Sequence, residues 1–106
     1  MSLAALDPLL QPFDLGPLHL RNRVVSTSHE PAYGHDGMPK ERYRLYHREK
    51  AKGGVALTMI GGSAIIAPDS PPAFGNLHLY KDEIVPWFRE LADDVHEHGA
   101  AVMIQL

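Results

Sequence analysis

Three short polar segments carry the residues of this chain best suited to chemistry, and each follows an apolar stretch. The first is residues 26–30, with the sequence STSHE; the second is residues 61–63, with the sequence GGS; the third is Gln105. Glycines let backbone amides approach a ring closely, and a glutamine amide donates and accepts hydrogen bonds at once. The segments therefore suit a flat polar heterocycle. They contain no catalytic triad, phosphate-binding Walker loop or clustered metal ligands.

The elements before these segments have strand patterns. Residues 13–21 predict a short hairpin that turns at Gly16-Pro17, and residues 23–28 predict the first full strand, with Val24 and Val25 as buried residues. Residues 55–60 are nearly all apolar, which is typical of a strand buried on both faces. A third buried strand is expected from residue 100 onward.

Two helices are expected between the strands. The first runs from Pro39, which suits a first helical turn, to Lys52, and glycines end it. Its predicted packing face carries Tyr43, Tyr46 and Lys50, and the run HREK at 47–50 is expected to be solvated. The second helix, at 82–98, has apolar residues at helical spacing. A long connection at 61–81 separates the second strand from this helix.

The order hairpin, β, α, β, α, β indicates an α/β fold with a parallel sheet and crossover helices. In such a fold ligands bind at the carboxyl ends of the strands, where the three polar segments stand. A third strand at the end of the sequence would leave sheet edges open. We therefore expect the N-terminal part of a TIM (β/α)₈ barrel, a fold of about 250 residues. A complete three-stranded domain is the alternative.

The composition of the chain excludes several classes of function. The 106 residues carry a net charge of −3, which argues against a nucleic-acid partner, and they contain no cysteine, which excludes disulfides and thiolate chemistry. No apolar run approaches the roughly 20 residues of a membrane span, and the start lacks the basic residues of a secretory signal. A cytoplasmic protein without membrane contact is the expectation.

Three sequence stretches together resemble the opening of the Old Yellow Enzyme, or NADH:flavin oxidoreductase, family. They are PFDLGPLHLRNRVV, GGVALTMIGGSA and DDVHEHGAAVMIQL, in this order. The likeness is greatest to the branch of larger members that includes 2,4-dienoyl-CoA reductase and trimethylamine dehydrogenase. It implies that residues 12–106 form the N-terminal portion of an FMN-binding TIM barrel, preceded by an extension at residues 1–11.

The resemblance also implies site residues. The end of the first strand would pack along FMN, a small residue after the second strand would approach the flavin ring, and a glutamine on the third strand would bond its pyrimidine edge. The cofactor-binding residues so implied are Thr27, Ser28, His29, Glu30, Gly62 and Gln105. Trimethylamine dehydrogenase attaches its flavin to a cysteine at the place of Glu30, so FMN would be non-covalent here. Glu30 would either attract a cationic amine or turn to solvent.

By the same resemblance the activity is hydride transfer through flavin N5. The substrate would be an enoyl thioester, an enone or an N-methylated amine, with NADH or NADPH as co-substrate. An iron–sulfur cluster, the catalytic residues and the phosphate-binding loops lie later in such proteins, so no catalytic residue is assigned in this chain. We expect residues 1–106 alone to be inactive and to bind FMN weakly, and micromolar affinity in a fluorescence titration would contradict this.

Plainer interpretations stand beside this one. Residues 26–28 could cap backbone groups at a strand end, paired glycines end many strands, and a buried Gln is usually a satisfied core residue. His96 and His98 are expected to be surface residues rather than metal ligands, because neighbours two apart do not share a helix face. The whole chain could also be a non-catalytic half-barrel module that forms homo-oligomers through its open sheet edges.

Overall fold

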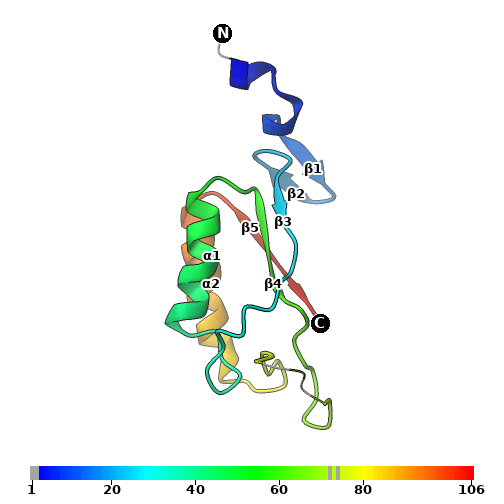
Figure 1. Cartoon of the computed structure of the whole chain (residues 1–106), viewed down its shortest axis with the longest axis vertical. Helices are drawn as coiled ribbons and strands as arrows, with labels where there is room; N and C mark the ends of the chain where they lie inside the picture. Colours follow the sequence, from blue (N-terminus) through cyan, green and yellow to red (C-terminus); the bar gives the residue numbers. More distant parts are fainter. Residues whose placement is uncertain (1–2, 72, 74) are drawn as a thin grey trace.

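The chain folds into an elongated body of 54 × 22 × 22 Å (Figure 1). This computed structural model describes residues 3–71, 73 and 75–106. The elements are, in order, the 3-10 helices η1 (Leu3–Leu6) and η2 (Pro8–Leu10), β1 (Phe13–Leu15), β2 (Leu18–Leu20), β3 (Val25–Ser26), α1 (Glu41–Lys52), β4 (Leu57–Gly61), α2 (Ile84–Glu97) and β5 (Ala101–Gln105).

Strands β3, β4 and β5 form one parallel sheet with β4 in the centre. Leu57 of β4 pairs with Val25 on one side and with Ala101 on the other, and at the far end Gly61 pairs with Gln105. Helices α1 and α2 lie next to each other on one face of this sheet (Figure 1). The predicted parallel sheet with crossover helices is confirmed, and so is the hairpin, in which β1 and β2 pair antiparallel.

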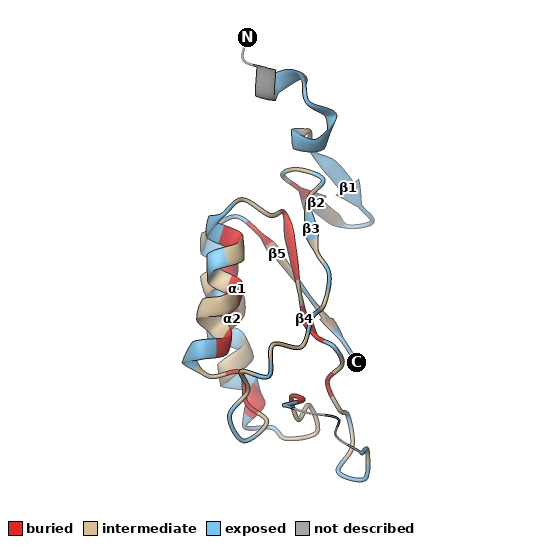
Figure 2. Cartoon of the chain, in the orientation of Figure 1, coloured by how far each residue is buried: buried red, intermediate tan, exposed pale blue. Residues whose placement is uncertain are grey.

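Two apolar clusters hold these layers together, and Figure 2 shows their buried residues on β4 and along the helices. The larger cluster fills the space between the helices and the sheet. Its fully buried members include Tyr43, Ile60, Leu77, Leu91 and Val95. The smaller cluster, Leu20, Ala56 and Leu57, joins the hairpin to the start of β4. Because the sheet packs on the helices through the larger cluster, the helix layer fixes the positions of the strand ends that carry the polar segments.

The outer strands differ from the prediction. Strand β3 covers only Val25–Ser26 rather than residues 23–28, and Val25 is 40% exposed instead of buried. Along β5, Met103 and Gln105 are exposed, although a buried strand was expected. The reason is the same for both strands: their exposed side chains lie on the helix-free face of the sheet, where among the described residues the hairpin covers only the start of β4, at Leu57.

Helix α1 also corrects the sequence-based interpretation. It begins at Glu41 rather than Pro39. Tyr43 of the predicted face is buried, but the other buried residues are His47 and Ala51, whereas Tyr46 and Lys50 are half-buried. His47 follows Tyr43 by one turn, so both point to the sheet. Its imidazole lies 2.7 Å from the Thr58 hydroxyl of β4. The expectation that HREK forms a solvated face was therefore wrong for His47.

The buried His47 makes the stability of the fold depend on pH. Burial, with a smaller contribution from the Lys50 charge, lowers the pKa of His47 from 6.5 to about 4. Between these values the unfolded chain binds a proton that the folded chain does not. We expect the full free energy of unfolding above pH 6.5 and a loss of about 3 kcal/mol as the pH falls through 4. Urea unfolding across this range measures it.

Two variants isolate this effect. His47→Gln removes the titrating group, so the slope of stability against pH between 6.5 and 4 is expected to flatten. His96→Gln removes an exposed histidine of α2 and is expected to keep the slope of the unchanged chain. An equally steep slope in the His47→Gln variant would contradict the assignment.

Two further features agree with the sequence-based prediction: the connection that follows β4, and the helix α2. Residues 62–83 contain no helix or multi-residue strand within their described part, only a bridge between Ile65 and His78; positions 72 and 74 lie outside the described residues. Helix α2 buries Ile84, Leu91 and Val95, and Gly99 follows it with a φ of +82°. No helix in the described part of the chain is long and apolar enough to cross a membrane.

Candidate functional site

The ends of the three parallel strands meet at one edge of the sheet. The Ser28 hydroxyl, just after β3, donates a hydrogen bond to the side-chain oxygen of Gln105 on β5. Gly61, the last residue of β4, pairs with Gln105, and the Gln105 carbonyl oxygen accepts a 3.0 Å hydrogen bond from the Ala64 amide. Parallel strands place their carboxyl ends together, which is why residues 77 positions apart come into contact.

Both glycines after β4 are required by close backbone contacts. Gly61 and Gly62 have φ angles of +102° and +137°, which L side chains rarely adopt. A Cβ atom on Gly61 would lie 2.7 Å from the Gln105 carbonyl oxygen, and one on Gly62 would lie 2.7 Å from the Glu30 backbone nitrogen. The turn after β4 is therefore packed between the ends of the two other strands.

Glu30 is half-buried, with its two carboxylate oxygens in different surroundings. Oε1 accepts a 3.0 Å hydrogen bond from the Ala32 amide, whereas Oε2 is buried with no hydrogen-bond partner among the described residues. Burial raises the pKa of Glu30, and the Ala32 hydrogen bond and the His29 charge offset part of this rise. One of the two expectations for Glu30 was that its side chain turns to solvent. The buried Oε2 atom does not fit that expectation.

The structure brings together the predicted residues Ser28, Glu30, Gly62 and Gln105. Thr27 and His29, the other two, belong to the same segment and are exposed. His29 lies close enough to Glu30 for its charge to lower the pKa of that carboxyl.

Tyr43 of α1 is the site residue that sequence reasoning missed. Its side chain is fully buried, and its hydroxyl oxygen accepts a 3.2 Å hydrogen bond from the Gly61 amide. Burial is the main cause that raises the pKa of Tyr43, and the nearby Glu30 charge adds to it. The helical spacing of Tyr43 predicted only packing, and no sequence signal shows that its hydroxyl reaches the end of β4.

The polar groups at this edge fit a flat heterocycle that has both N–H and C=O groups. The Gln105 amide and the Ser28 hydroxyl can each donate and accept. The buried Glu30 Oε2 is an acceptor that still lacks a donor. A separate apolar pocket of about 250 Å³ lies between the hairpin and β3, lined in part by Phe13 and Leu20, and is not part of this edge.

Comparison with known proteins agrees with this fold. Residues 8–106 match the family described as NADH:flavin oxidoreductase / NADH oxidase. A probable N-methylproline demethylase of Rhizobium meliloti is 65% identical over 100 residues, which cover 94% of this chain and 15% of that protein. A multifunctional alkene reductase/demethylase OYE of Caballeronia cordobensis is 52% identical, covering 100% of this chain and 16% of that protein.

The fold is shared with solved structures as well. A 2-naphthoyl-CoA reductase superposes with a TM-score of 0.86 at 24% identity, covering 93% of this chain and 15% of that chain. The predicted α/β fold, with the hairpin and the first three strands of a (β/α)₈ barrel, is confirmed. This chain spans about one sixth of the length of these two curated relatives. It belongs to the NADH:flavin oxidoreductase / NADH oxidase family, to which the Old Yellow Enzymes belong.

Proposed function

We propose that this chain is part of a longer FMN-dependent oxidoreductase that oxidises the C–N bond of an N-methylated amine. The observation that carries the proposal is the convergence of Ser28, Gly62 and Gln105 at the carboxyl edge of the sheet, in a chain of this family. Bound FMN supplies the hydride acceptor, its N5 atom. Residues 12–106 would form the N-terminal portion of the FMN-binding barrel, and residues 1–11 an extension before it.

The residues of this chain would bind and orient the cofactor without a covalent bond. Gln105 presents an amide that can donate to a ring carbonyl and accept from a ring N–H. Gly62 leaves room for close backbone approach. The segment that carries Thr27, Ser28, His29 and Glu30 would line the same ring. The flavin carries the redox chemistry, and the protein positions it.

The substrate proposal depends on the relatives. Both relatives are named as demethylases, one as a probable N-methylproline demethylase and the other as a multifunctional alkene reductase/demethylase. Oxidative N-demethylation would convert the N-methyl group and one water to formaldehyde, the secondary amine and a proton, with bound flavin supplying the acceptor for the hydride. Reduction of an enone or enoyl thioester with NADH or NADPH is the second candidate, supported by the alkene reductase relative.

The proposal also includes groups of the longer protein that lie outside these 106 residues. Catalytic acid–base groups and an iron–sulfur cluster would come from the rest of the longer protein, so the 106-residue chain alone would be inactive. A cytoplasmic location and a homo-oligomeric assembly complete the proposal. The exposed Val25 and Met103 on the helix-free face of the sheet support its association with further protein, and a half-barrel module that self-associates is the alternative.

Anaerobic reduction of the full-length protein tests the function. Addition of N-methylproline to the yellow protein is expected to bleach the visible flavin absorbance and to release one formaldehyde per flavin reduced. An enone is expected to reoxidise flavin that NADH has reduced if alkene reduction is the main activity. A full-length protein that is purified without flavin and does not take up FMN would contradict the proposed function. A protein that catalyses only the second reaction, the reduction of the enone, would be assigned to the reductases.

A further inference from the structure

Helix α1 carries basic side chains on two opposite flanks. Arg44 and Arg48 lie on one flank, and Arg42 and Lys50 lie on the other, because residues two apart point in nearly opposite directions on a helix. The residues that α1 buries against the sheet stand between the two flanks. In Figure 1 α2 lies behind α1, along the first flank, and no other helix of the described residues lies beside the second.

Carboxylates of α2 neutralise the first flank. Asp94 lies 2.6 Å from Nη1 of Arg44 and 3.8 Å from Nη1 of Arg48, and Glu90 lies 4.0 Å from Nε of Arg44. The pair is mostly buried, with exposed side-chain fractions of 20% for Arg44 and 12% for Asp94. Where a neighbouring helix covers basic residues of α1, that helix therefore supplies the carboxylates.

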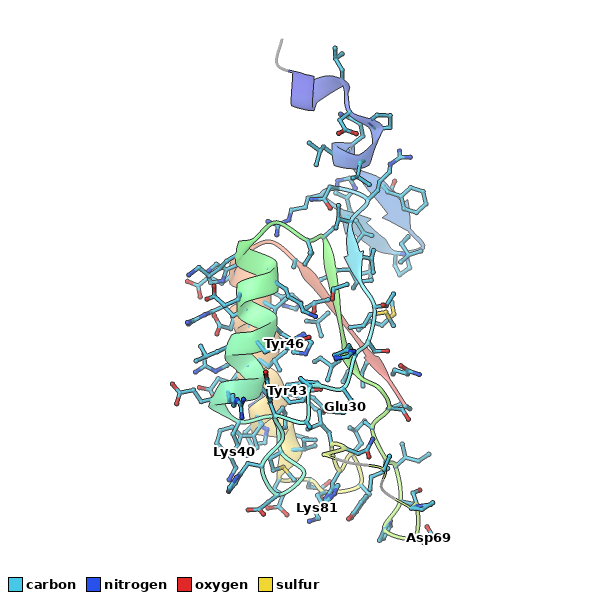
Figure 3. All side chains as sticks on the ribbon, viewed as in Figure 1. Glu30, Lys40, Tyr43, Tyr46, Asp69 and Lys81 are labelled. Atoms are coloured by element: carbon cyan, nitrogen blue, oxygen red, sulfur yellow. The ribbon has the colours of Figure 1, made fainter. Side chains whose placement is uncertain are left out.

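The second flank, which we call the open flank, consists of Arg42, Tyr46 and Lys50. The half-buried Lys50 ammonium donates a 2.8 Å hydrogen bond to the Ser26 hydroxyl of β3 and lies 4.3 Å from the centre of the Tyr46 ring. The Arg42 guanidinium lies 3.8 Å from the centre of the Tyr33 ring, which contacts Tyr46 edge-on. No carboxylate in the described part of the chain forms an ion pair with either cation. The labelled Tyr46 marks this flank in Figure 3.

A segment packed on the open flank would remove water from the Lys50 ammonium. A hydroxyl and a ring face compensate that loss less well than a carboxylate does, and a desolvated cation without a carboxylate is strongly destabilising. The same side of the sheet ends at β3, whose outer edge has no strand beside it in the described residues. In a closed (β/α)₈ barrel every strand and every helix has a neighbour on both sides.

We propose that the open flank is the docking surface for an acidic helix of the longer protein, the helix that closes the barrel beside α1, and that this helix places a carboxylate on the Lys50 ammonium. Arg42, at the exposed end of the flank, adds positive charge that attracts the same helix. The inference rests on the proposed function only in that this chain is part of a longer barrel protein. The contact lies on the helix side of the sheet and needs no cofactor.

Carbodiimide cross-linking of the full-length protein, followed by peptide mass spectrometry, tests the contact, because this reagent joins an amine to a carboxylate that touches it. We expect an amide between Lys50 and an Asp or Glu outside residues 1–106, in a helical segment. Lys52 is the internal control: its ammonium lies 3.6 Å from the Glu49 carboxylate, and we expect these two to be joined. A mixture of protein with light and heavy nitrogen distinguishes a contact within one chain from a contact between two copies.

Hydrogen exchange of the full-length protein tests whether the charge of Lys50 holds the docked helix. In Lys50→Glu two carboxylates would repel each other, so we expect the α1 peptide and the cross-linked peptide outside residues 1–106 to exchange about tenfold faster. Lys52→Glu makes the same charge change in the same last turn of α1, at an exposed position off the open flank. It is expected to leave the exchange of the distant peptide unchanged. Replacing the cross-linked carboxylate by lysine in the Lys50→Glu protein is expected to restore slow exchange.

Three results would overturn the proposal. They are the absence of a cross-link from Lys50 to a carboxylate outside residues 1–106, a Lys50 cross-link that joins two copies of the protein, and equal exchange of the distant peptide in Lys50→Glu and Lys52→Glu. If Lys50→Glu does not fold, the cross-link in the unchanged protein decides.

Neither measurement needs flavin, so this inference and the proposed function fail separately. A full-length protein that takes up no FMN but shows the Lys50 cross-link loses the proposed function and keeps the docking surface. A protein that binds FMN and shows no such cross-link loses the docking surface alone.

Discussion

Gly62→Ala is expected to raise the FMN dissociation constant of the full-length protein about a hundredfold. The added Cβ would lie 2.7 Å from the Glu30 backbone nitrogen and 3.0 Å from its Cβ, and the φ of +137° adds backbone strain. Overpacking and an unfavourable φ each cost about 1–3 kcal/mol, and a combined 3 kcal/mol corresponds to this loss if it is expressed in the pocket. Fluorescence titration with FMN measures it.

Gly54→Ala is the matched control for Gly62→Ala. Gly54 also has a positive φ, +109°, but a Cβ there would meet nothing within 4 Å. This variant therefore carries backbone strain without the steric conflict, and it stands between α1 and β4, at the opposite end of the strand from the site. Its FMN affinity is expected to equal that of the unchanged protein. A Gly62→Ala protein that binds FMN equally well would show that the turn does not contact the cofactor.

Arg21→Met is expected to lower the free energy of unfolding of the chain by about 4 kcal/mol. The Arg21 guanidinium donates to three backbone carbonyl oxygens near the ends of both helices: His98 at 2.7 Å, Ala51 at 2.7 Å and Val55 at 2.9 Å. Each hydrogen bond from a charged donor contributes about 1.5–3 kcal/mol, and methionine keeps much of the apolar stem. Urea unfolding followed by Trp87 fluorescence measures the loss.

Arg23→Met provides the comparison for this variant. The Arg23 guanidinium makes one long hydrogen bond, 3.4 Å to the Pro12 carbonyl oxygen, and packs over the exposed Phe13 ring. We expect its removal to cost less than about 1 kcal/mol. Equal losses in the two variants would mean that Arg21 contributes only a positive charge and not the contacts that join the two helix ends.

Much of the site could be predicted because it depends on strand order. Once β3, β4 and β5 are parallel neighbours, their carboxyl ends must meet, and Ser28, Gly62 and Gln105 stand at or just after those ends. The apolar residues of β4 and the glycines after β4 and α2 are local signals that need no knowledge of distant contacts. The sequence itself therefore determined the fold class, the family and the edge of the sheet at which we propose that a ligand binds.

Only the tertiary structure decided which polar side chains are buried in the interior. His47 and Lys50 belong to one charged run, yet His47 is buried because it follows Tyr43 by one helical turn on the face that meets β4. Val25 is apolar and exposed, because the helix layer covers only one face of the sheet. The Tyr43 hydroxyl and Glu30 Oε2 reach the edge from different elements. Such contacts depend on how helix and sheet pack in three dimensions, and residue type and local spacing do not contain that information.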